Sequence, residues 1–133
     1  MDFRTGWSNS ENSKFAKNTT GILNTKANIL VICGQNKRRS RTAEFLYKND
    51  DRFNIRSAGL SPRSDRQLKA KDLDWADLVL VMEDSHSSRI KKDYRNLDLP
   101  PIEVLHIDDE YDYLQPELID LLKDRIEVIV SDL

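Results

Sequence analysis

Four short segments rich in apolar residues recur along the chain, and each is predicted to be a strand. Residues 28–33 and 77–82 each begin with one polar residue and continue as an apolar run, as expected of strands that are buried on both faces of a parallel sheet. Residues 53–58 alternate weakly between apolar and polar and are followed by a glycine, whereas residues 102–107 come directly after two prolines. Both segments are predicted to be further strands, because turn residues bound them.

Helical patterns fill the intervals between these strands. Residues 40–48 are predicted to form a helix, residues 64–71 a short helix or a turn, and residues from Asp84 or Ser85 to about Tyr94 a further helix. A last helix begins at Pro116, a favourable first helical residue, and apolar residues recur along one face of it: Leu118, Ile119, Leu122, Ile126 and Ile129. Alternating strands and helices predict an α/β fold, a three-layer αβα domain with a four-stranded parallel sheet.

The first part of the chain has a different character. Residues 1–27 are rich in Ser, Asn, Thr and Lys, contain the isolated aromatic residues Phe3, Trp7 and Phe15, and show no sustained period. They are predicted to be a mobile polar N-terminal extension. The α/β domain is expected over residues 28–133, and a chain of 133 residues has room for one such domain.

Charge and composition exclude several classes of protein. The 21 Lys and Arg against 23 Asp and Glu give a net charge of −2, which argues against binding nucleic acid through bulk charge. No apolar run approaches the roughly 20 residues of a membrane span, and no apolar secretory segment is present. The chain is therefore expected to be a cytoplasmic protein, with no membrane partner, that is a monomer or a weak dimer.

The metal-ligating and redox-active residues are few. A single cysteine excludes an intramolecular disulfide, a dithiol redox cycle and a zinc site built of cysteines. The two histidines, His86 on a predicted surface helix and His106 within a predicted strand, are not expected to form a metal site with it. No metal and no cofactor are predicted.

The loop after the first strand carries the strongest chemical signal. Cys33 ends that strand, and Arg39 and Ser40 follow it at six and seven residues, where a helix begins. A loop that leads from a strand into a helix turns its backbone N–H groups inward and forms a nest for an anion. The Arg39 guanidinium can bind two oxygens of a phosphoryl group, and the same nest stabilises a thiolate to which Ser40 donates a hydrogen bond.

The competing interpretation is that Cys33 is a packed strand residue and the arginines are solvated. By ordinary residue usage this spacing of Arg and Ser arises by chance about once in a hundred cysteines, so the functional interpretation is favoured. Gly34 permits a tight turn and a close backbone approach. Lys37 and Arg38, with Arg41, form a basic cluster at the mouth that either is solvated or attracts an anionic substrate.

These segments resemble the low-molecular-weight protein tyrosine phosphatase family, and more narrowly a short bacterial branch of it. The matching segments are VICGQNKRRS (31–40), TAE (42–44), RSAG (56–59), WADLVLVM (75–82) and DEY (109–111). The resemblance implies the phosphotyrosine protein phosphatase I-like fold and metal-independent hydrolysis of phosphotyrosine, or of a small aryl phosphate, through a cysteinyl-phosphate intermediate. Inorganic phosphate or another oxyanion would occupy the same loop.

The resemblance also implies roles for individual residues. Cys33 would be the nucleophile, Arg39 the phosphate clamp, and Asn36 the residue that holds the shape of the loop. The residues expected to form the substrate-binding site are Gly34, Gln35, Asn36, Lys37, Arg38, Ser40 and Tyr111.

The loop departs from the family pattern at several positions. Arg38 stands where the family often has a second, protective cysteine, Arg41 where it has a proline, and Gln35 where it has a glycine. The segment between Gly59 and Trp75 is also shorter than in the standard enzymes. Part of the wall that contacts the ring of the substrate is therefore expected to be missing.

The reaction also needs a proton donor for the leaving group, and the acidic segment after the last strand offers one. Aligning Tyr111 with the family tyrosine assigns the general acid to Asp109, with Asp108 as the alternative. Repulsion between clustered carboxylates favours protonation of one of them. The other interpretation is that these acids only favour the dipole of the following helix. Tyr111 either stacks on a substrate ring or is a partly buried structural residue.

Three other functions remain open. An arsenate reductase with this fold would need an external thiol, because the chain has no further cysteine. The phosphocysteine carriers of sugar phosphotransferase systems lack the arginine clamp, which argues against that function. A non-catalytic module that binds phosphate or phosphoproteins is the remaining alternative.

Overall fold

The computed structural model describes residues 26–131, so nearly all of the predicted N-terminal extension lies outside the described residues. The predicted four-stranded parallel sheet is confirmed. Its strands are β1 (Ala27–Cys33), β2 (Phe53–Gly59), β3 (Leu78–Val81) and β4 (Ile102–Val104). They lie in the order β2-β1-β3-β4, and every neighbouring pair is parallel.

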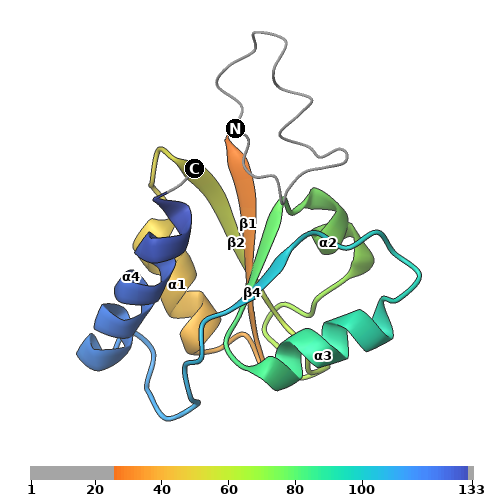
Figure 1. The fold of residues 1–133 in the computed structure, drawn as a ribbon. Coiled ribbons are helices and arrows are strands. Elements are labelled where there is room, and N and C mark those ends of the chain that lie inside the picture. Colours follow the sequence, from red (N-terminus) through yellow and green to blue (C-terminus); the bar gives the residue numbers. More distant parts are fainter. Residues whose placement is uncertain (1–25, 132–133) are drawn as a thin grey trace, which may run out of the picture.

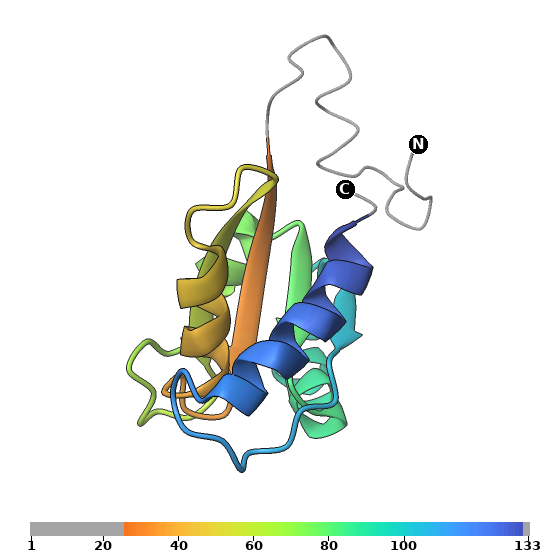
Figure 2. The same ribbon diagram turned by 90° about the vertical axis from the view of Figure 1, so that its left-hand side faces the viewer.

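Helices cover both faces of this sheet, which gives the predicted three layers (Figures 1 and 2). Helices α1 (Arg39–Tyr47) and α4 (Pro116–Val130) pack on one face, and α2 (Ala70–Trp75) and α3 (Asp84–Asp93) pack on the other. None of the helices that the structure describes is long and apolar enough to span a membrane.

The central strands β1 and β3 supply both cores, which explains their unbroken apolar sequence. In β1, Ile29 and Val31 join the core beneath α1 and α4, whereas Leu30 and Ile32 join the core beneath α2 and α3. All four side chains are fully buried. Because successive residues of a strand point to opposite faces, a strand between two helical layers needs apolar residues at every position.

The segment between β2 and β3 differs in part from its prediction. Turns and bends occupy residues 61–66, residues 67–69 are neither turn nor helix, and the short helix α2 lies later than predicted, at Ala70–Trp75. Buried Asp72 fixes its start, because one carboxylate oxygen accepts a hydrogen bond from the backbone N–H of Lys69 at 2.9 Å and the other from Arg66 at 3.1 Å. The periodicity of so short a helix is too weak to be read from sequence.

The last strand and the last helix were predicted with errors. Strand β4 ends at Val104 rather than at residue 107, because the chain turns at His106, whose φ of 57° lies in the left-handed region. In α4, Val130 completes the buried face, whereas the predicted Ile119 and Ile129 are only half-buried. The shorter strand directs the following segment towards the carboxyl ends of the other strands.

Candidate functional site

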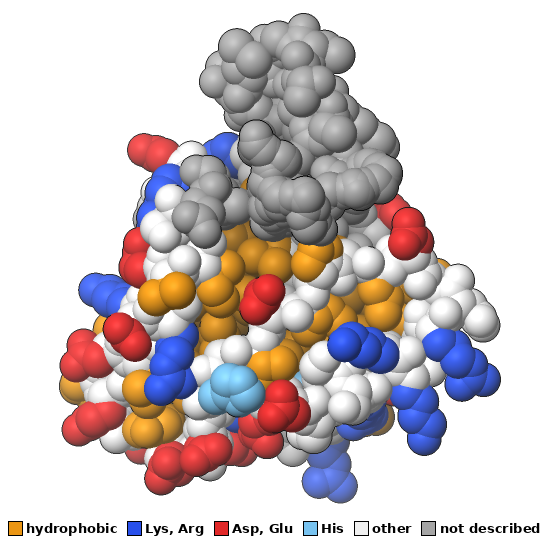
Figure 3. All heavy atoms as spheres, in the orientation of Figure 1, with side chains coloured by type: hydrophobic (Ala, Val, Ile, Leu, Met, Phe, Trp, Pro, Cys, Tyr) orange, Lys and Arg blue, Asp and Glu red, His pale blue; other side chains and the backbone are white. Residues whose placement is uncertain are grey.

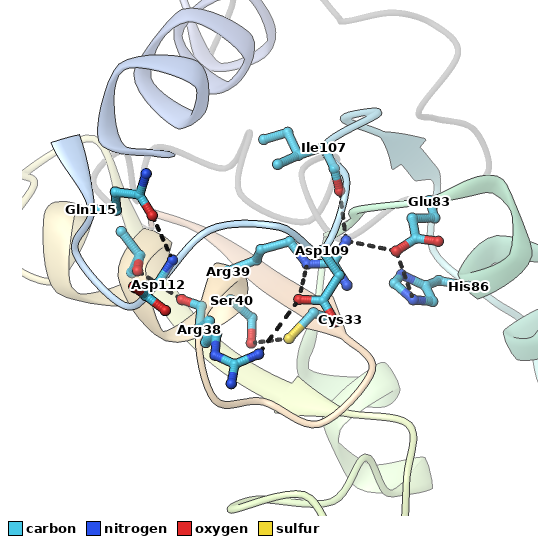
Figure 4. Close-up of polar contacts among 11 residues, drawn as sticks. Cys33, Arg38, Arg39, Ser40, Glu83, His86, Ile107, Asp109, Asp112 and Gln115 are labelled. Carbon is cyan, nitrogen blue, oxygen red and sulfur yellow. Dashed lines mark hydrogen bonds and ion pairs between the residues drawn. The ribbon is translucent and has the colours of Figure 1, made fainter. Parts of the chain in front are cut away.

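The carboxyl ends of the strands surround a cavity of about 510 Å³, with Cys33 in its lining. The residues that line it come from the loop after β1, the segment after β2, the start of α3 and the segment after β4: Cys33, Gly34, Gln35, Lys37, Arg38, Arg39, Leu60, Ser61, Glu83, Ser85, His86, Arg89 and Asp109. This is the edge of the sheet at which the sequence predicts a ligand site. Figure 4 shows the polar contacts around it.

The loop after β1 is held from outside through its carbonyl groups. The carbonyls of Cys33, Gly34 and Gln35 accept hydrogen bonds from the backbone N–H groups of residues 60, 61 and 65, at 3.1, 2.8 and 3.3 Å. Within residues 26–131, the N–H groups of Lys37 and Arg38 donate to no protein acceptor. Successive N–H groups without an acceptor at a helix N-terminus are suited to binding an anion.

A chain of polar side chains links the loop to the thiol. Asn36 is buried, and its backbone has a left-handed conformation with a φ of 53°. Its Nδ2 donates to Ser40 Oγ at 2.8 Å. Ser40 Oγ in turn lies 3.0 Å from Cys33 Sγ. Because the Ser40 oxygen accepts from Asn36, its own hydrogen is available to the sulfur. This contact is the one that the sequence predicts between Ser40 and Cys33.

Arg39 crosses from α1 to two other elements. Its side chain is almost fully buried, and Nη1 donates to Glu83 Oε2 at 2.7 Å and to the carbonyl of Ile107 at 2.6 Å. Its Nε lies 3.7 Å from Asp109 Oδ1. Among the described residues no acceptor contacts Nη2, so one end of the fork is available to an anion in the cavity.

The structure separates the two candidate acids. Asp109 lines the cavity, and its Oδ1 lies 4.0 Å from Arg38 Nη1 as well as 3.7 Å from Arg39 Nε (Figure 4). Asp108 is exposed and is not part of the lining. Figure 3 shows acidic side chains gathered along the lower edge of the molecule, where the strands end. Among the acidic residues of the segment after β4, residues 108–112, only Asp109 lines the cavity.

The far end of the acidic segment is attached to α1 and to the start of α4. The backbone N–H of Leu114, a residue with φ 61°, donates to Thr42 Oγ1 at 3.0 Å. The N–H of Asp112 donates to Gln115 Oε1 at 2.8 Å. The segment that carries Asp109 is therefore held by side chains of other elements rather than by regular secondary structure.

Some of the predicted substrate-binding residues do not reach the cavity. Asn36 and Ser40 are buried beneath the loop and support it instead of lining the cavity. Tyr111 packs against the core beneath α1 and α4, which is the structural alternative that the sequence left open. The other predicted residues do line the cavity: Gly34, Gln35, Lys37 and Arg38.

Sequence reasoning missed the contribution of α3. His86 was predicted on a surface helix, but it is only 8% exposed and lines the cavity, with Nε2 4.0 Å from Glu83 Oε2. Burial lowers the pKa of His86 below its ordinary value of 6.5, although Glu83 opposes the shift. A usable signal exists in the sequence, because Glu83 and His86 follow directly on the apolar run of β3, where side chains reach the carboxyl edge of the sheet.

The basic cluster at the mouth is partly neutralised. Asp65 lies 3.1 Å from Lys37 Nζ and 3.4 Å from Arg41 Nη1, and Glu44 lies 3.7 Å from Arg41 Nε. Lys37 and Arg38 of this cluster line the cavity, whereas Arg41 does not. Within the described residues no Phe, Tyr or Trp side chain lines it, and no group of three or more potential ligand residues is suited to a metal ion.

The fold resembles that of solved phosphatase structures. SP-PTP, a low-molecular-weight protein tyrosine phosphatase from Streptococcus pyogenes, superposes with a TM-score of 0.68 at 17% identity, covering 80% of this chain and 93% of that chain. The tyrosine phosphatase Wzb from Escherichia coli K30, solved in complex with phosphate, gives 0.63 at 23% identity, covering 82% and 99%. The YwlE arginine phosphatase from Geobacillus stearothermophilus gives 0.59 at 23% identity, covering 80% and 94%.

Comparison at the level of sequence adds nothing to this result, since no family model and no curated protein matches the chain. The structural likenesses show the fold, which is that of the low-molecular-weight protein tyrosine phosphatases, as the sequence resemblance predicts. At these identities they do not carry the activity or the roles of the residues.

Proposed function

We propose that this protein is a metal-independent cysteine phosphatase that hydrolyses phosphotyrosine or similar aryl phosphates. The observation that carries the proposal is the position of Cys33 beside Ser40, in a cavity that Arg39 and Asp109 share. A thiol, an arginine fork, unpaired loop N–H groups and a carboxyl group facing them form a set suited to phosphoryl transfer through a covalent intermediate. The phosphate, sulfate and benzylphosphonate complexes of Wzb proteins with this fold agree with an oxyanion in the loop.

In the first step the Cys33 thiolate attacks phosphorus, and the bond from phosphorus to the leaving oxygen breaks. Asp109 gives its proton to that oxygen, so that the phenol leaves in neutral form. The N–H groups of the loop and the free end of Arg39 hold the phosphoryl oxygens. In the second step a water attacks the phosphocysteine, Asp109 takes the proton from that water, and inorganic phosphate and the thiolate are released.

The surroundings of the leaving group differ from an aromatic slot. On the side of β2 the lining of the cavity contains Leu60, a large apolar side chain, next to Ser61. On the other side, α3 contributes Arg89 to the lining. A substrate ring would therefore lie against an aliphatic side chain and polar groups.

The test is hydrolysis of 4-nitrophenyl phosphate in the presence of EDTA. We expect turnover that vanadate inhibits, that is lost in Cys33→Ser, and that leaves a phosphate adduct on Cys33 detectable by mass spectrometry after an acid quench. Asp109→Asn should lower kcat/KM by about 10²–10⁴-fold, whereas the matched variant Asp108→Asn should stay near wild type.

Two outcomes would contradict the proposal. Turnover that persists in Cys33→Ser would exclude the covalent route. Tight vanadate or phosphate binding by the wild type without turnover of any aryl phosphate would favour the non-catalytic binding module instead.

A further inference from the structure

Arg125 projects from α4 onto the backbone that leads to Asp109. Its Nη1 donates to the carbonyl of Leu105 at 2.6 Å and to the carbonyl of His106 at 2.9 Å. Arg125 does not line the cavity, and its other ionic contact is Asp124, whose Oδ2 lies 3.9 Å from Nε. The guanidinium is thus directed at main-chain atoms.

The two carbonyls flank an unusual turn. His106 has a φ of 57°, a left-handed conformation that residues other than glycine rarely adopt. Such a conformation persists where the surrounding structure holds it. Here the turn ends β4 and brings the chain towards the cavity, where Asp109 stands three residues later.

The rest of this short stretch is fixed as well. The N–H groups of Leu105 and Ile107 donate to the carbonyls of Val81 and Met82 at the end of β3, at 2.8 and 2.9 Å. The carbonyl of Ile107 accepts from Arg39. Arg125 holds the two carbonyls that the sheet and Arg39 leave without a donor, so its removal would release the turn itself.

We propose that Arg125 is a positioning residue for the general acid, an inference that rests on the proposed role of Asp109. Without Arg125 the turn at His106 loses its support, and Asp109 moves away from its place beside Arg39 Nε. Proton transfer needs a donor within hydrogen-bond reach, and a shift of about 1 Å can cost about 10²-fold in rate. The Cys33 loop has no contact with Arg125, so oxyanion binding should persist.

The experiment measures kcat/KM for aryl phosphates that range from good to poor leaving groups. A poor leaving group needs the proton most, so loss of the acid makes the dependence on leaving-group pKa steeper. Arg125→Met should lower kcat/KM for phenyl phosphate by about tenfold to a hundredfold, and for 2,4-dinitrophenyl phosphate far less. Vanadate affinity should stay near that of the wild type.

Three further variants make the result specific. The quantity compared is the slope of log kcat/KM against the pKa of the leaving group. Asp109→Asn gives the slope expected when the acid is absent, and the slope of Arg125→Met should move towards it. Arg125→Lys keeps a donor on a similar stem and should restore part of the wild-type slope. Lys123→Met, on the exposed side of the same helix, should leave it unchanged. Partial unfolding lowers the rate for every substrate by one factor, so it does not alter the slope.

A uniform loss across all leaving groups, or no change at all in Arg125→Met, would overturn the positioning role while leaving the phosphatase proposal intact. If Arg125→Met does not fold, a steeper slope in Arg125→Lys than in the wild type supports the role, and a loss in Arg125→Lys that is uniform across leaving groups overturns it. A slope that is unchanged in Asp109→Asn would instead show that the acid assignment itself is wrong, and the role of Arg125 would fall with it.

Discussion

The loop after β1 and the segment after β4 meet over the same cavity, yet they are held in different ways. In the first, the supporting polar side chains lie within eight residues of sequence, since Ser40 contacts the Cys33 thiol and Asn36 donates to Ser40. In the second, the supporting side chains come from other elements: Thr42 from α1 and Arg125 from α4. The supporting residues of the first loop are buried, namely Cys33, Asn36 and Ser40, whereas Asp109 is more than half exposed.

This difference follows from what each loop does in the proposed reaction. A nest for an anion is built from consecutive backbone N–H groups, so its sequence must be local. A proton donor needs only one carboxyl group at the right place, and any element that packs nearby can hold it there. Arg39 joins the two regions, because it begins α1 directly after the first loop and donates to Ile107 at the start of the second.

Replacing that shared residue should have the largest effect. We expect Arg39→Lys to lower kcat/KM for aryl phosphates by about 10²–10³-fold, because an ammonium cannot bind Glu83, Ile107 and a phosphoryl oxygen in one fork. The dependence on leaving-group pKa should also become steeper, since the acid segment loses one of its donors. Steady-state kinetics on the leaving-group series measures both effects.

Arg38→Lys is the matched control for that change. Arg38 is exposed, and its Nη1 lies 4.0 Å from Asp109 Oδ1, so its replacement should cost far less. Equal losses in the two variants would show that the buried fork has no special role and that the two regions are not joined through Arg39.

A smaller effect is expected where the first loop rests on β2. A methyl group on Gly59 would meet Ser64 Oγ and would lie 2.7 Å from the backbone nitrogen of Asn36. Gly59→Ala should therefore lower the free energy of unfolding by about 1–3 kcal/mol, as overpacking does. Urea denaturation measures the change.

Gly34→Ala tests the same loop from its open side. Nothing lies within 4 Å of a Cβ at Gly34, so its free energy of unfolding should change by no more than about 0.5 kcal/mol. If both alanines are tolerated equally, the loop moves freely on β2, and the contrast with the acid segment disappears.

The same contrast explains what the sequence could predict. The sheet and its central strands followed from unbroken apolar runs, and the pairing of Cys33 with Ser40 followed from a short spacing. Asp109 could be chosen over Asp108 only by resemblance, and their different positions at the cavity became visible in the structure. The turn at His106 depends on Arg125, nineteen residues further along, and no local pattern announces such a contact.

The side of the cavity formed by α3 was missed for a similar reason. Polar residues at the start of a helix are typical of an exposed surface, yet Ser85 and His86 line the cavity and Glu83 accepts a hydrogen bond from Arg39. For Tyr111 the sequence left a substrate contact and a structural role open, and the structure packs it, partly buried, against the core beneath α1 and α4.

His86 gives the smallest expected effect, on stability rather than on turnover. Burial lowers its pKa in the folded state, so the unfolded chain takes up a proton first as the pH falls. The stability that neutral His86 contributes is therefore present above about pH 6.5 and is lost as the pH falls through the lower, folded-state pKa. Between pH 7.5 and 5.5, Tm should fall less in His86→Gln than in the wild type.

The pH range in which His86 affects stability differs from that of two carboxylates outside the cavity, which are hydrogen-bonded to Arg52. Hydrogen bonds from Arg52 lower the pKa values of Asp50 and Glu127, whose ordinary values are 3.8 and 4.5, so their contribution is lost only at more acidic pH. Glu127→Gln is thus the control, and it should leave the dependence of Tm on pH unchanged above pH 5.5. If Tm falls equally with pH in the wild type and in His86→Gln, His86 is solvated in the folded protein. The first loop and the acid segment would then be joined through Arg39 and Glu83, without a closed wall from α3.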